Sequence, residues 1–279
     1  MSFIPFYREL VEVLIGLENL KRSLSHIMRG IRIVERLSAE YIVEVRSAMS
    51  KKEISRLRRE YLGRVSSVIK RLGNDFKLLS EANRKLSRIP DIDPEKPTII
   101  VAAVPNVGKS TLVRKVSSAK PEIAPYPFTT RNLILGHIKI DEVNIIQIMD
   151  TPGLLDRPLS EKNPIELQAV TALKYLADVI IFLIDPTYHS GYPLDYQLRV
   201  LQEIKANFKE IPIVIAINKI DIAKHDEIRI AKEQLLKVFE RINLYEISAA
   251  KGVNLDKLIK DAIKIALNRK ASGGLIHQT

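Results

Sequence analysis

Apolar side chains recur every three or four positions through the first third of the chain. Between residues 10 and 48 they are Leu10, Leu14, Leu17, Leu20, Leu24, Ile27, Ile31, Val34, Leu37, Tyr41, Val45 and Ala48. This spacing is the period of an amphipathic α-helix. Gly16 and Gly30 can mark helix breaks or points of close approach, so the pattern predicts either one helix or two.

A second run with the same period begins after Ser50. Ser50 is suited to cap a helix, and Glu53 three residues later completes a capping box. We expect this helix to continue to about Arg88, before Pro90. Its apolar stripe is Ile54, Leu57, Tyr61, Val65, Val68, Leu72, Phe76 and Leu79. Helices with one apolar face must pack together, so residues 1–90 are predicted to form an all-α antiparallel bundle.

The pattern changes after residue 90. The stretch IPDIDPEKP contains three prolines and no periodic apolar positions, which predicts a linker over residues 91–97. Short apolar runs then alternate with helical stretches: TIIVAA (98–103), VNIIQIM (143–149), DVIIFLI (178–184), IPIVIAIN (211–218) and LYEIS (244–248). Such runs indicate an α/β domain with a mostly parallel sheet, which we place at 98–270, followed by a frayed tail at 271–279.

The first predicted strand is followed by a phosphate-binding motif. The stretch from Ala103 to Thr111 reads AVPNVGKST, which has P-loop spacing although Ala103 replaces the usual glycine. In such a loop, backbone N–H groups surround the phosphates, Lys109 reaches the outer phosphates and the Ser110 hydroxyl binds Mg²⁺. The residues expected to contact the nucleotide are Asn106, Val107, Gly108, Lys109, Ser110 and Thr111.

Three further motifs follow predicted strands in the order that a GTPase requires. Asp150, at the start of DTPG, would hold Mg²⁺ through water, and the Gly153 N–H would meet the γ-phosphate. In NKID, the Asp221 carboxylate can accept from the two donors on the edge of guanine, which adenine lacks. In SAAK, the Ala249 N–H could reach guanine O6. The residues expected at the base are Asn218, Lys219, Asp221, Ser248, Ala249 and Ala250.

A mobile switch is expected between the P-loop and Asp150. The stretch from Ala124 to Arg131 contains Thr129 and Thr130, either of which can bind Mg²⁺ by its hydroxyl and the γ-phosphate by its backbone. We favour Thr130. The proposed catalytic residues are therefore Lys109, Thr130 and Gly153, and the magnesium ligands Ser110, Thr130 and Asp150.

Charge is unevenly distributed along the chain. Residues 1–90 contain 19 Lys and Arg against 10 Asp and Glu, which leaves +2 of the total net charge of +11 for residues 91–279. This excess favours a polyanionic partner such as nucleic acid, although basic helices can simply be soluble. Five basic residues lie opposite the apolar stripe of the second helix: Lys52, Arg56, Arg59, Lys70 and Lys77. They can follow a phosphate backbone, and the lack of aromatic side chains among them favours structured RNA over single strands.

The sequence excludes several other classes of function. No apolar run reaches the roughly 18 residues of a membrane span, and the start lacks a signal-peptide pattern, so we expect a cytoplasmic protein. There are no cysteines, and the five histidines show no metal-ligand spacing. Neither a nucleophilic triad nor a carboxylate pair is needed for phosphoryl transfer to water.

The motifs together resemble a known family. VPNVGKSTLVRKV, PYPFTTRN, DTPGLLDRP and NPIELQAVTAL look like the Obg family of GTPases, specifically its nucleolar GTP-binding branch. The N-terminal stretches LRREYLGRVSSVIKRL and KLSRIPDIDP are similar to that branch as well. The resemblance implies GTP and GDP as ligands and a role in large ribosomal subunit assembly. The long C-terminal extension of the eukaryotic members is missing, which suggests a compact, archaeal relative.

The residue after Gly153 bears on hydrolysis. It is Leu154, where Ras-type GTPases place a glutamine that orients the attacking water. We therefore expect hydrolysis to be slow alone and to depend on a partner or a cation. Asn106 occupies the position that binds K⁺ in related potassium-activated GTPases, and a loop-stabilising hydrogen bond is the alternative role for this side chain.

Two functions remain open from the sequence. The first is a monomeric regulatory GTPase that binds ribosomal RNA or pre-ribosomal particles. The second is a GTP-dependent module that binds a protein or an anionic membrane surface, with incidental hydrolysis.

Overall fold

The computed structural model describes residues 5–87, 89, 91–125, 132–142, 144–239 and 242–273. The chain forms two compact units. The helical unit is Val11–Ser87, and the sheet unit comprises the described residues of Met1–Leu10 and Arg88–Thr279. The arrangement confirms the predicted fold class, an α-helical N-terminal region followed by a mostly parallel sheet.

The sheet unit is built on seven strands in the order β2-β3-β4-β1-β5-β6-β7. They are β1 (Thr98–Ala102), β2 (Glu122–Pro125), β3 (Asn132–Lys139), β4 (Ile145–Asp150), β5 (Val179–Ile184), β6 (Ile213–Ile217) and β7 (Asn243–Glu246). The β2–β3 and β3–β4 pairs are antiparallel and the other pairs are parallel. Every residue of β1 and β5 is buried, which explains their uninterrupted apolar sequences.

Two strands at one edge of the sheet were not predicted. β3 has Gly136 and His137 between its apolar residues, and β2 is only four residues long and ends at Pro125. Neither therefore carries the apolar run that identified the other strands. The predicted switch starts too early, because Ala124 and Pro125 belong to β2. Residues 126–131, including Thr129 and Thr130, lie outside the described part of the chain.

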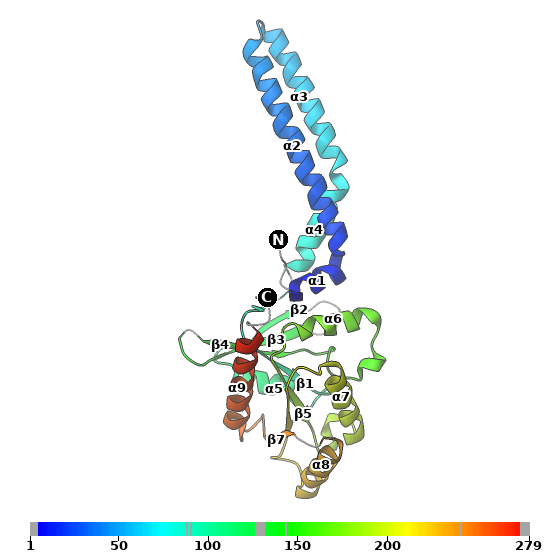
Figure 1. The fold of residues 1–279 in the computed structure, drawn as a ribbon, viewed down its shortest axis with the longest axis vertical. Helices are drawn as coiled ribbons and strands as arrows, with labels where there is room; N and C mark the ends of the chain where they lie inside the picture. The colour runs from blue at the N-terminus through cyan, green and yellow to red at the C-terminus, as the bar shows by residue number, and fades with distance from the viewer. Residues whose placement is uncertain are drawn as a thin grey trace. The chain divides into compact units, whose positions relative to one another are not determined.

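Helices cover both faces of this sheet. They are α5 (Lys109–Val116), α6 (Pro164–Lys174), α7 (Leu194–Asn207), α8 (His225–Val238) and α9 (Leu255–Gly273), with short 3₁₀ turns η1 (Leu159–Glu161) and η2 (Tyr188–Ser190). Figure 1 shows α5 and α9 on one side of the sheet and α7 and α8 on the other. Helix α9 extends three residues into the predicted tail, and residues 274–279 lie outside the described part.

The segment predicted as a linker is anchored to the sheet unit. Residues 91–97 form neither helix nor strand, yet Ile92 is buried and its carbonyl accepts a 2.6 Å hydrogen bond from Tyr7 Oη. The Asp93 N–H donates to Gln147 Oε1 at 2.9 Å, and Gln147 Nε2 donates to the Asp93 carbonyl at 2.8 Å. The side chain of Gln147 in β4 therefore holds this segment against the sheet.

The helical unit is dominated by two long helices. Its elements are the end of α1 (Pro5–Ile15), then α2 (Leu17–Ser47), α3 (Lys51–Arg71) and α4 (Gly73–Leu86). In Figure 1, α2 and α3 run side by side in opposite directions, as an antiparallel bundle requires. Gly16, with φ of 82°, separates α1 from α2, whereas Gly30 lies within α2. The first glycine is thus a helix break and the second is a point of close approach.

The second predicted helix is in fact two. It breaks at Leu72, whose ψ of 2° leaves the helical range, and α4 starts at Gly73. Leu72 packs against Gly30, since a Cβ on that glycine would lie only 2.5 Å from Leu72 Cδ1. Packing between α2 and Leu72 therefore decides where α3 ends and α4 begins. The period of the apolar residues alone does not show this boundary. Ser50 caps α3 as predicted by accepting from the Glu53 N–H at 3.2 Å.

One side of the α2–α3 pair exposes apolar side chains. The exposed apolar residues of α2 fall within one arc of about 100° around the helix axis. This arc lies next to the stripe that contacts α3. The exposed apolar residues of α3 are rotated from its contact stripe in the same sense as those of α2. Because the two helices are antiparallel, both sets then lie on one side of the pair. The set comprises Leu24, Met28, Ile31, Ile42 and Val45 on α2 and Ile54, Leu62 and Ile69 on α3, each between 36% and 53% exposed. Across the described ranges, none of the helices has both the length and the apolar character needed to cross a membrane.

Candidate functional site

The loop between β1 and α5 depends on residues with unusual backbone angles. Gly108, with φ of 110°, immediately precedes α5. A Cβ at this position would lie 2.5 Å from the side-chain nitrogen Nδ2 of Asn218. Asn106 also has a positive φ, 63°, a region that asparagine tolerates better than most residues. Ala103 is not among the described residues with positive φ. Alanine therefore fits the first position of the motif without backbone strain.

Lys109 folds back over this loop from the first turn of α5. Its buried ammonium donates to the carbonyls of Ala103 at 2.8 Å and Val104 at 3.0 Å. The following N–H groups of α5 and the helix dipole attract anions at the same end. Val107 is buried, whereas Thr111 is exposed. The loop, the ammonium and the helix terminus can together bind a phosphate chain.

Ser110 and Asp150 meet beside the loop. Ser110 Oγ donates to Asp150 Oδ2 at 2.5 Å, although the two residues come from α5 and β4. Asp150 is fully buried, and its Oδ1 has no hydrogen-bond partner in the described structure. Burial raises the pKa of the Asp150 carboxyl, against the opposing effects of Lys109 and the Ser110 hydrogen bond.

These two residues fit a divalent cation. A buried carboxylate oxygen without a partner is costly, and a hard cation bound directly or through water would satisfy it. The serine hydroxyl supplies a second oxygen at the same place. The third predicted magnesium ligand, Thr130, lies outside the described residues.

Gly153, the predicted γ-phosphate sensor, is engaged by nearby side chains. Its N–H donates to Asp156 Oδ2 at 2.9 Å, and its carbonyl accepts from Lys162 Nζ at 3.0 Å. Lys162 Nζ lies 3.8 Å from Asp156 Oδ1, and the Lys162 side chain has no exposed surface. Burial lowers the pKa of the Lys162 ammonium, and Asp156 opposes that shift. Neither Asp156 nor Lys162 belongs to the site residues predicted from the sequence.

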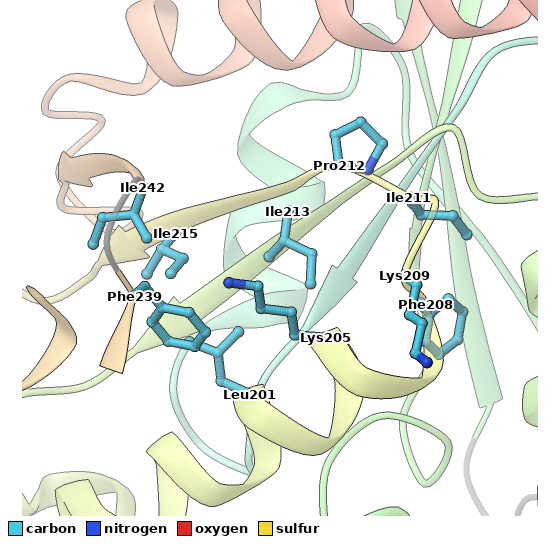
Figure 2. Close-up of a pocket in the computed structure, with 10 residues that line it drawn as sticks. All are labelled: Leu201, Lys205, Phe208, Lys209, Ile211, Pro212, Ile213, Ile215, Phe239 and Ile242. Carbon is cyan, nitrogen blue, oxygen red and sulfur yellow. The ribbon is translucent and has the colours of Figure 1, made fainter. Parts of the chain in front are cut away.

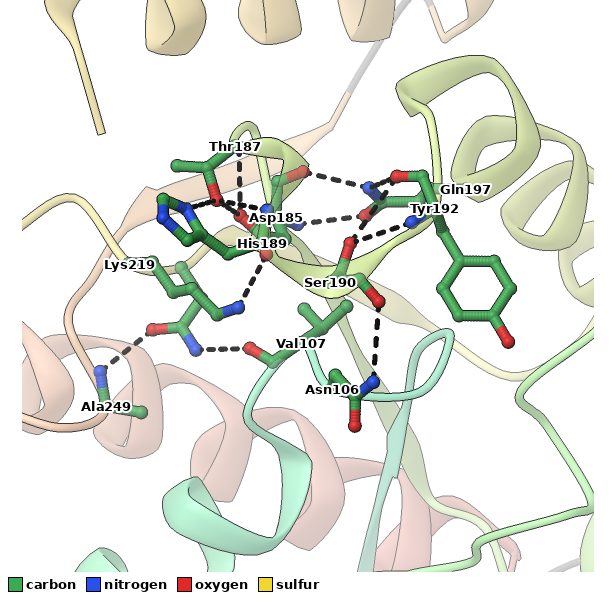
Figure 3. A network of polar contacts seen from close by, with 11 residues as sticks. Asn106, Val107, Asp185, Thr187, His189, Ser190, Tyr192, Gln197, Lys219 and Ala249 are labelled. Carbon is green, nitrogen blue, oxygen red and sulfur yellow. Dashed lines mark hydrogen bonds and ion pairs between the residues drawn. The ribbon is translucent and has the colours of Figure 1, made fainter. Parts of the chain in front are cut away.

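Asn218 joins the phosphate loop to the last motif. At the end of β6, its Nδ2 donates to the Val107 carbonyl at 2.7 Å, and its Oδ1 accepts from the Ala249 N–H at 2.9 Å (Figure 3). The side chain therefore ties together two loops far apart in sequence. The Ala249 N–H, predicted to reach guanine O6, is occupied by this bond, so its contact with a base stays a prediction.

Asp185 was missed by the sequence analysis. This buried carboxylate at the end of β5 accepts from Lys219 Nζ at 2.6 Å and from Thr187 Oγ1 at 2.6 Å (Figure 3). Gln197 holds its backbone through two 2.9 Å hydrogen bonds. The sequence did contain a signal, because Asp185 directly follows an apolar run, as Asp150 does. Asp185 fixes the lysine of the base-recognition motif.

The remaining residues predicted to recognise the base lie beyond β6 and β7. Asp221 is exposed, and in the described structure no hydrogen bond or ion pair engages its carboxylate. Ser248 is buried and its Oγ accepts from the Lys251 N–H at 3.1 Å, while Ala250 is exposed. Asp221 is thus available to a ligand, and Ser248 shapes the loop beside it.

Four motifs converge at one edge of the sheet. The P-loop follows β1, Asp150 ends β4, Asn218 follows β6 and Ser248 follows β7. These strands are mutually parallel, so their carboxyl ends meet on the same edge. Ligands of open α/β sheets bind at that edge. The fold therefore assembles a single site from residues separated by more than 100 positions.

Asn106 lies at the rim of this site. Its Nδ2 donates to the Ser190 carbonyl at 3.4 Å, a long contact that links the P-loop to η2 (Figure 3). The side-chain oxygen remains for another partner.

The residues predicted to bind RNA belong to the helical unit. Lys52, Arg56, Arg59 and Lys70 lie on α3 and are exposed. Lys77 is exposed too, but it lies on α4, so the predicted row does not follow one continuous helix. Within the described ranges, no group of three or more His, Asp or Glu side chains could hold a metal ion.

A separate apolar cavity lies at the other end of β6. It measures about 230 Å³ and is lined mainly by apolar residues of α7, of β6 and of the segments that follow α7 and α8, together with Lys205 and Lys209 (Figure 2). The lining includes Ile213 and Ile215, near the amino end of β6. Because Asn218 follows the opposite end of this strand, the cavity is not part of the candidate site.

Sequence comparisons identify the family. The model of the NOG1 N-terminal helical domain matches residues 1–93, and that of Nucleolar GTP-binding protein 1 (NOG1) matches residues 164–221. A crystal structure identified as nucleolar GTP-binding protein 1 from Plasmodium falciparum is 34% identical, with a TM-score of 0.56, over 68% of this chain and 96% of that one. This chain belongs to the nucleolar GTP-binding protein 1 family.

Curated relatives match most of this chain but only part of their own length. An uncharacterised protein of Methanocaldococcus jannaschii is 42% identical over 224 residues, which is 80% of this chain and 62% of that protein. Nucleolar GTP-binding protein 1 of Drosophila melanogaster is 35% identical over 80% of this chain and 34% of its own length. The chain thus spans between about a third and 62% of these two relatives.

Proposed function

We propose that this protein binds and hydrolyses GTP and acts as a regulatory protein in large ribosomal subunit assembly. The observation that carries the proposal is the convergence of four motifs at the carboxyl edge of one sheet. In this arrangement Lys109 and the N-terminus of α5 bind the phosphates, while Asp221 and the Ser248–Ala250 loop select guanine. The tie from Asn218 to both loops keeps the phosphate and base subsites at a constant separation.

Magnesium fits the pair formed by Ser110 and Asp150. When bound there, Mg²⁺ would neutralise negative charge that develops on the phosphates during hydrolysis. Gly153 would sense the γ-phosphate, and Thr130 would complete the switch. Leu154 is fully buried and cannot orient water, so we expect slow hydrolysis without a partner or a cation. Asn106 is the candidate K⁺ ligand, and equal turnover in KCl and NaCl would contradict that role.

The partner is inferred from charge and from the names of relatives. The five exposed basic residues of α3 and α4 would contact ribosomal RNA or a pre-ribosomal particle. Relatives are named nucleolar GTP-binding proteins, and this name supports the proposed role in ribosome assembly. We propose that this protein works as a cytoplasmic monomer and belongs to the Obg group of GTPases.

A second candidate function is favoured by the exposed apolar side of the α2–α3 pair. Solvated helices seldom present eight large apolar residues on one side, and such a surface is typical of a contact with protein or lipid. The helical unit would then act as a GTP-dependent docking module with incidental hydrolysis. In the first function, the bound nucleotide controls binding to large ribosomal subunits. In the second, it controls binding to a protein or membrane partner.

The nucleotide assignment is tested by changing the guanine-selecting carboxylate. Asp221→Asn should weaken GDP binding roughly 30-fold or more, because it removes a charged acceptor facing two donors. It should also improve binding of xanthosine diphosphate, whose carbonyl can accept from the new amide. Asp226→Asn, which changes an exposed acid paired with Arg229, is the matched control and should bind GDP normally. Unchanged GDP affinity in Asp221→Asn would contradict guanine selection by this residue.

The ribosomal assignment is tested with purified large subunits in low salt. Co-sedimentation that differs between GTP-analogue and GDP forms would support the assembly function. Binding to liposomes, with no binding to subunits or their RNA, would favour the docking module and leave the nucleotide site unaffected.

A further inference from the structure

Gly153, the predicted γ-phosphate sensor, forms a closed cluster with Asp156 and Lys162. Both backbone polar groups of Gly153 are engaged, its N–H by the Asp156 carboxylate and its carbonyl by the Lys162 ammonium. The φ of Gly153, 84°, allows this peptide orientation and is unfavourable for other residues. The N–H expected to recognise GTP is therefore already bound to an anionic oxygen of the protein.

The Asp156 carboxylate also brings negative charge to the predicted γ-phosphate contact, because its Oδ2 lies 2.9 Å from the Gly153 nitrogen. A γ-phosphate beside Asp150 and Gly153 would therefore meet a like charge at Asp156. Both the shared N–H and the charge oppose simultaneous occupation by the carboxylate and the phosphate.

We propose that Asp156 is a positioning residue that occupies the Gly153 N–H when no γ-phosphate is present and is displaced by the γ-phosphate of GTP. This inference rests on the proposed function. A carboxylate oxygen and a phosphate oxygen are both strong anionic acceptors, and this N–H serves one of them at a time. Asp156 therefore favours the nucleotide-free and GDP forms, and GTP must bind tightly enough to overcome that preference.

The same segment connects this exchange to α6. Arg157, next to Asp156, donates to both carboxylate oxygens of Glu166 at 2.8 and 2.9 Å. Glu166 also accepts from the Asn163 N–H at 3.0 Å in the capping box that begins α6. Release of Asp156 removes one anchor of this segment and leaves the Arg157–Glu166 pair and the Lys162 bond to the Gly153 carbonyl in place.

The experiment compares the affinities of a non-hydrolysable GTP analogue and of GDP, both with Mg²⁺. Asp156→Ala should raise analogue affinity about fivefold or more, the effect of losing one charged competitor for the N–H. GDP has no γ-phosphate, so its affinity should stay within about twofold. Asp156→Asn keeps an acceptor oxygen without the charge and should give a smaller rise in the same direction.

Lys162→Met provides the matched control. It removes the buried Lys162 ammonium but leaves the Asp156 bond to the Gly153 N–H. The ratio of analogue affinity to GDP affinity should therefore change less than about twofold. An equal rise in this variant would mean general loosening of the segment and would overturn the proposal. Equal weakening of both nucleotides in Asp156→Ala would overturn it too. Should Asp156→Ala not fold, an unchanged ratio in Asp156→Asn would decide against it. Failure of the wild-type protein to bind GDP would instead refute the proposed function.

Discussion

At the scale of single residues, buried polar side chains organise the candidate site. Asp185 and Asn218 are each at most 2% exposed, and the fold supplies their hydrogen-bond partners. Asp150 is equally buried but keeps one oxygen without a partner in the described structure. Buried polar groups are normally satisfied, so the exception marks the place where a ligand is expected. The satisfied residues hold the loops, and the unsatisfied one is where we propose that an ion binds.

Replacement of Asn218 tests this division at one residue. Asn218→Ala leaves the Val107 carbonyl and the Ala249 N–H without their partner, which should lower the free energy of unfolding by roughly 2–4 kcal/mol. Urea denaturation of the nucleotide-free protein measures the change. Asn207→Ala is the control, since this exposed side chain only donates to the Glu203 carbonyl in its own helix, and a loss within about 0.5 kcal/mol is expected. Similar losses in both variants would show that Asn218 does not join the two loops.

At the scale of elements, neighbouring packing decides what each helix glycine does. Gly63 in α3 has open space where a Cβ would stand, whereas a Cβ at Gly30 in α2 would press on Leu72. Glycine at either position lowers the stability of the helix, because glycine loses more conformational freedom on folding than other residues. Only Gly30 has a packing reason to be glycine, because Leu72 at the α3–α4 break occupies the space beside it.

Alanine at each glycine separates these two contributions. Gly63→Ala should stabilise the protein by about 0.5–1 kcal/mol, since it reduces the freedom of the unfolded chain and meets no neighbour. Gly30→Ala gains the same propensity but must displace Leu72, so its free energy of unfolding should be about 1 kcal/mol lower than that of Gly63→Ala. Urea denaturation gives both values. Equal stabilisation would mean that Leu72 does not restrict this position.

At the scale of the whole molecule, the two units differ in charge. Residues 11–87 contain 17 Lys and Arg against 9 Asp and Glu, which is +8 of the net +11 of the chain. Charge is thus concentrated in the unit that lacks the nucleotide motifs. A basic unit joined to a nucleotide-binding unit suits a protein whose attachment to a polyanion responds to its nucleotide.

Charge reversal on α3 tests the polyanion contact. Arg56→Glu with Arg59→Glu should weaken binding to ribosomal RNA and lower the slope of log affinity against log salt by about 2, since roughly one counterion is released per phosphate contact. Lys257→Glu with Lys260→Glu makes the same charge change at the same spacing on exposed positions of α9 and is the control. Filter binding over a salt series measures both. Equal losses in the two double variants would reduce the effect to net charge and exclude a specific role for α3.

Local patterns were sufficient for much of this protein. The periods of the apolar residues predicted the helical region and the buried parallel strands, because side-chain burial repeats with the geometry of each element. The order of the four motifs predicted their meeting, because parallel strands end on one edge of a sheet. Ser50 and Glu53 predicted the start of α3, because capping depends on residues three positions apart.

Only the tertiary structure decided the features that depend on contacts between distant residues. The edge strand β2 and its neighbour β3 exist because they pair within the sheet, and α3 ends where Leu72 meets Gly30 of α2. The partnership of Asp185 with Lys219 spans 34 positions, and the Lys162 bond to Gly153 spans nine. No local period or short motif encodes such pairs, because the chain path between them sets their separation. The sequence by itself therefore determined which elements and motifs are present, and the fold determined which side chains hold them together.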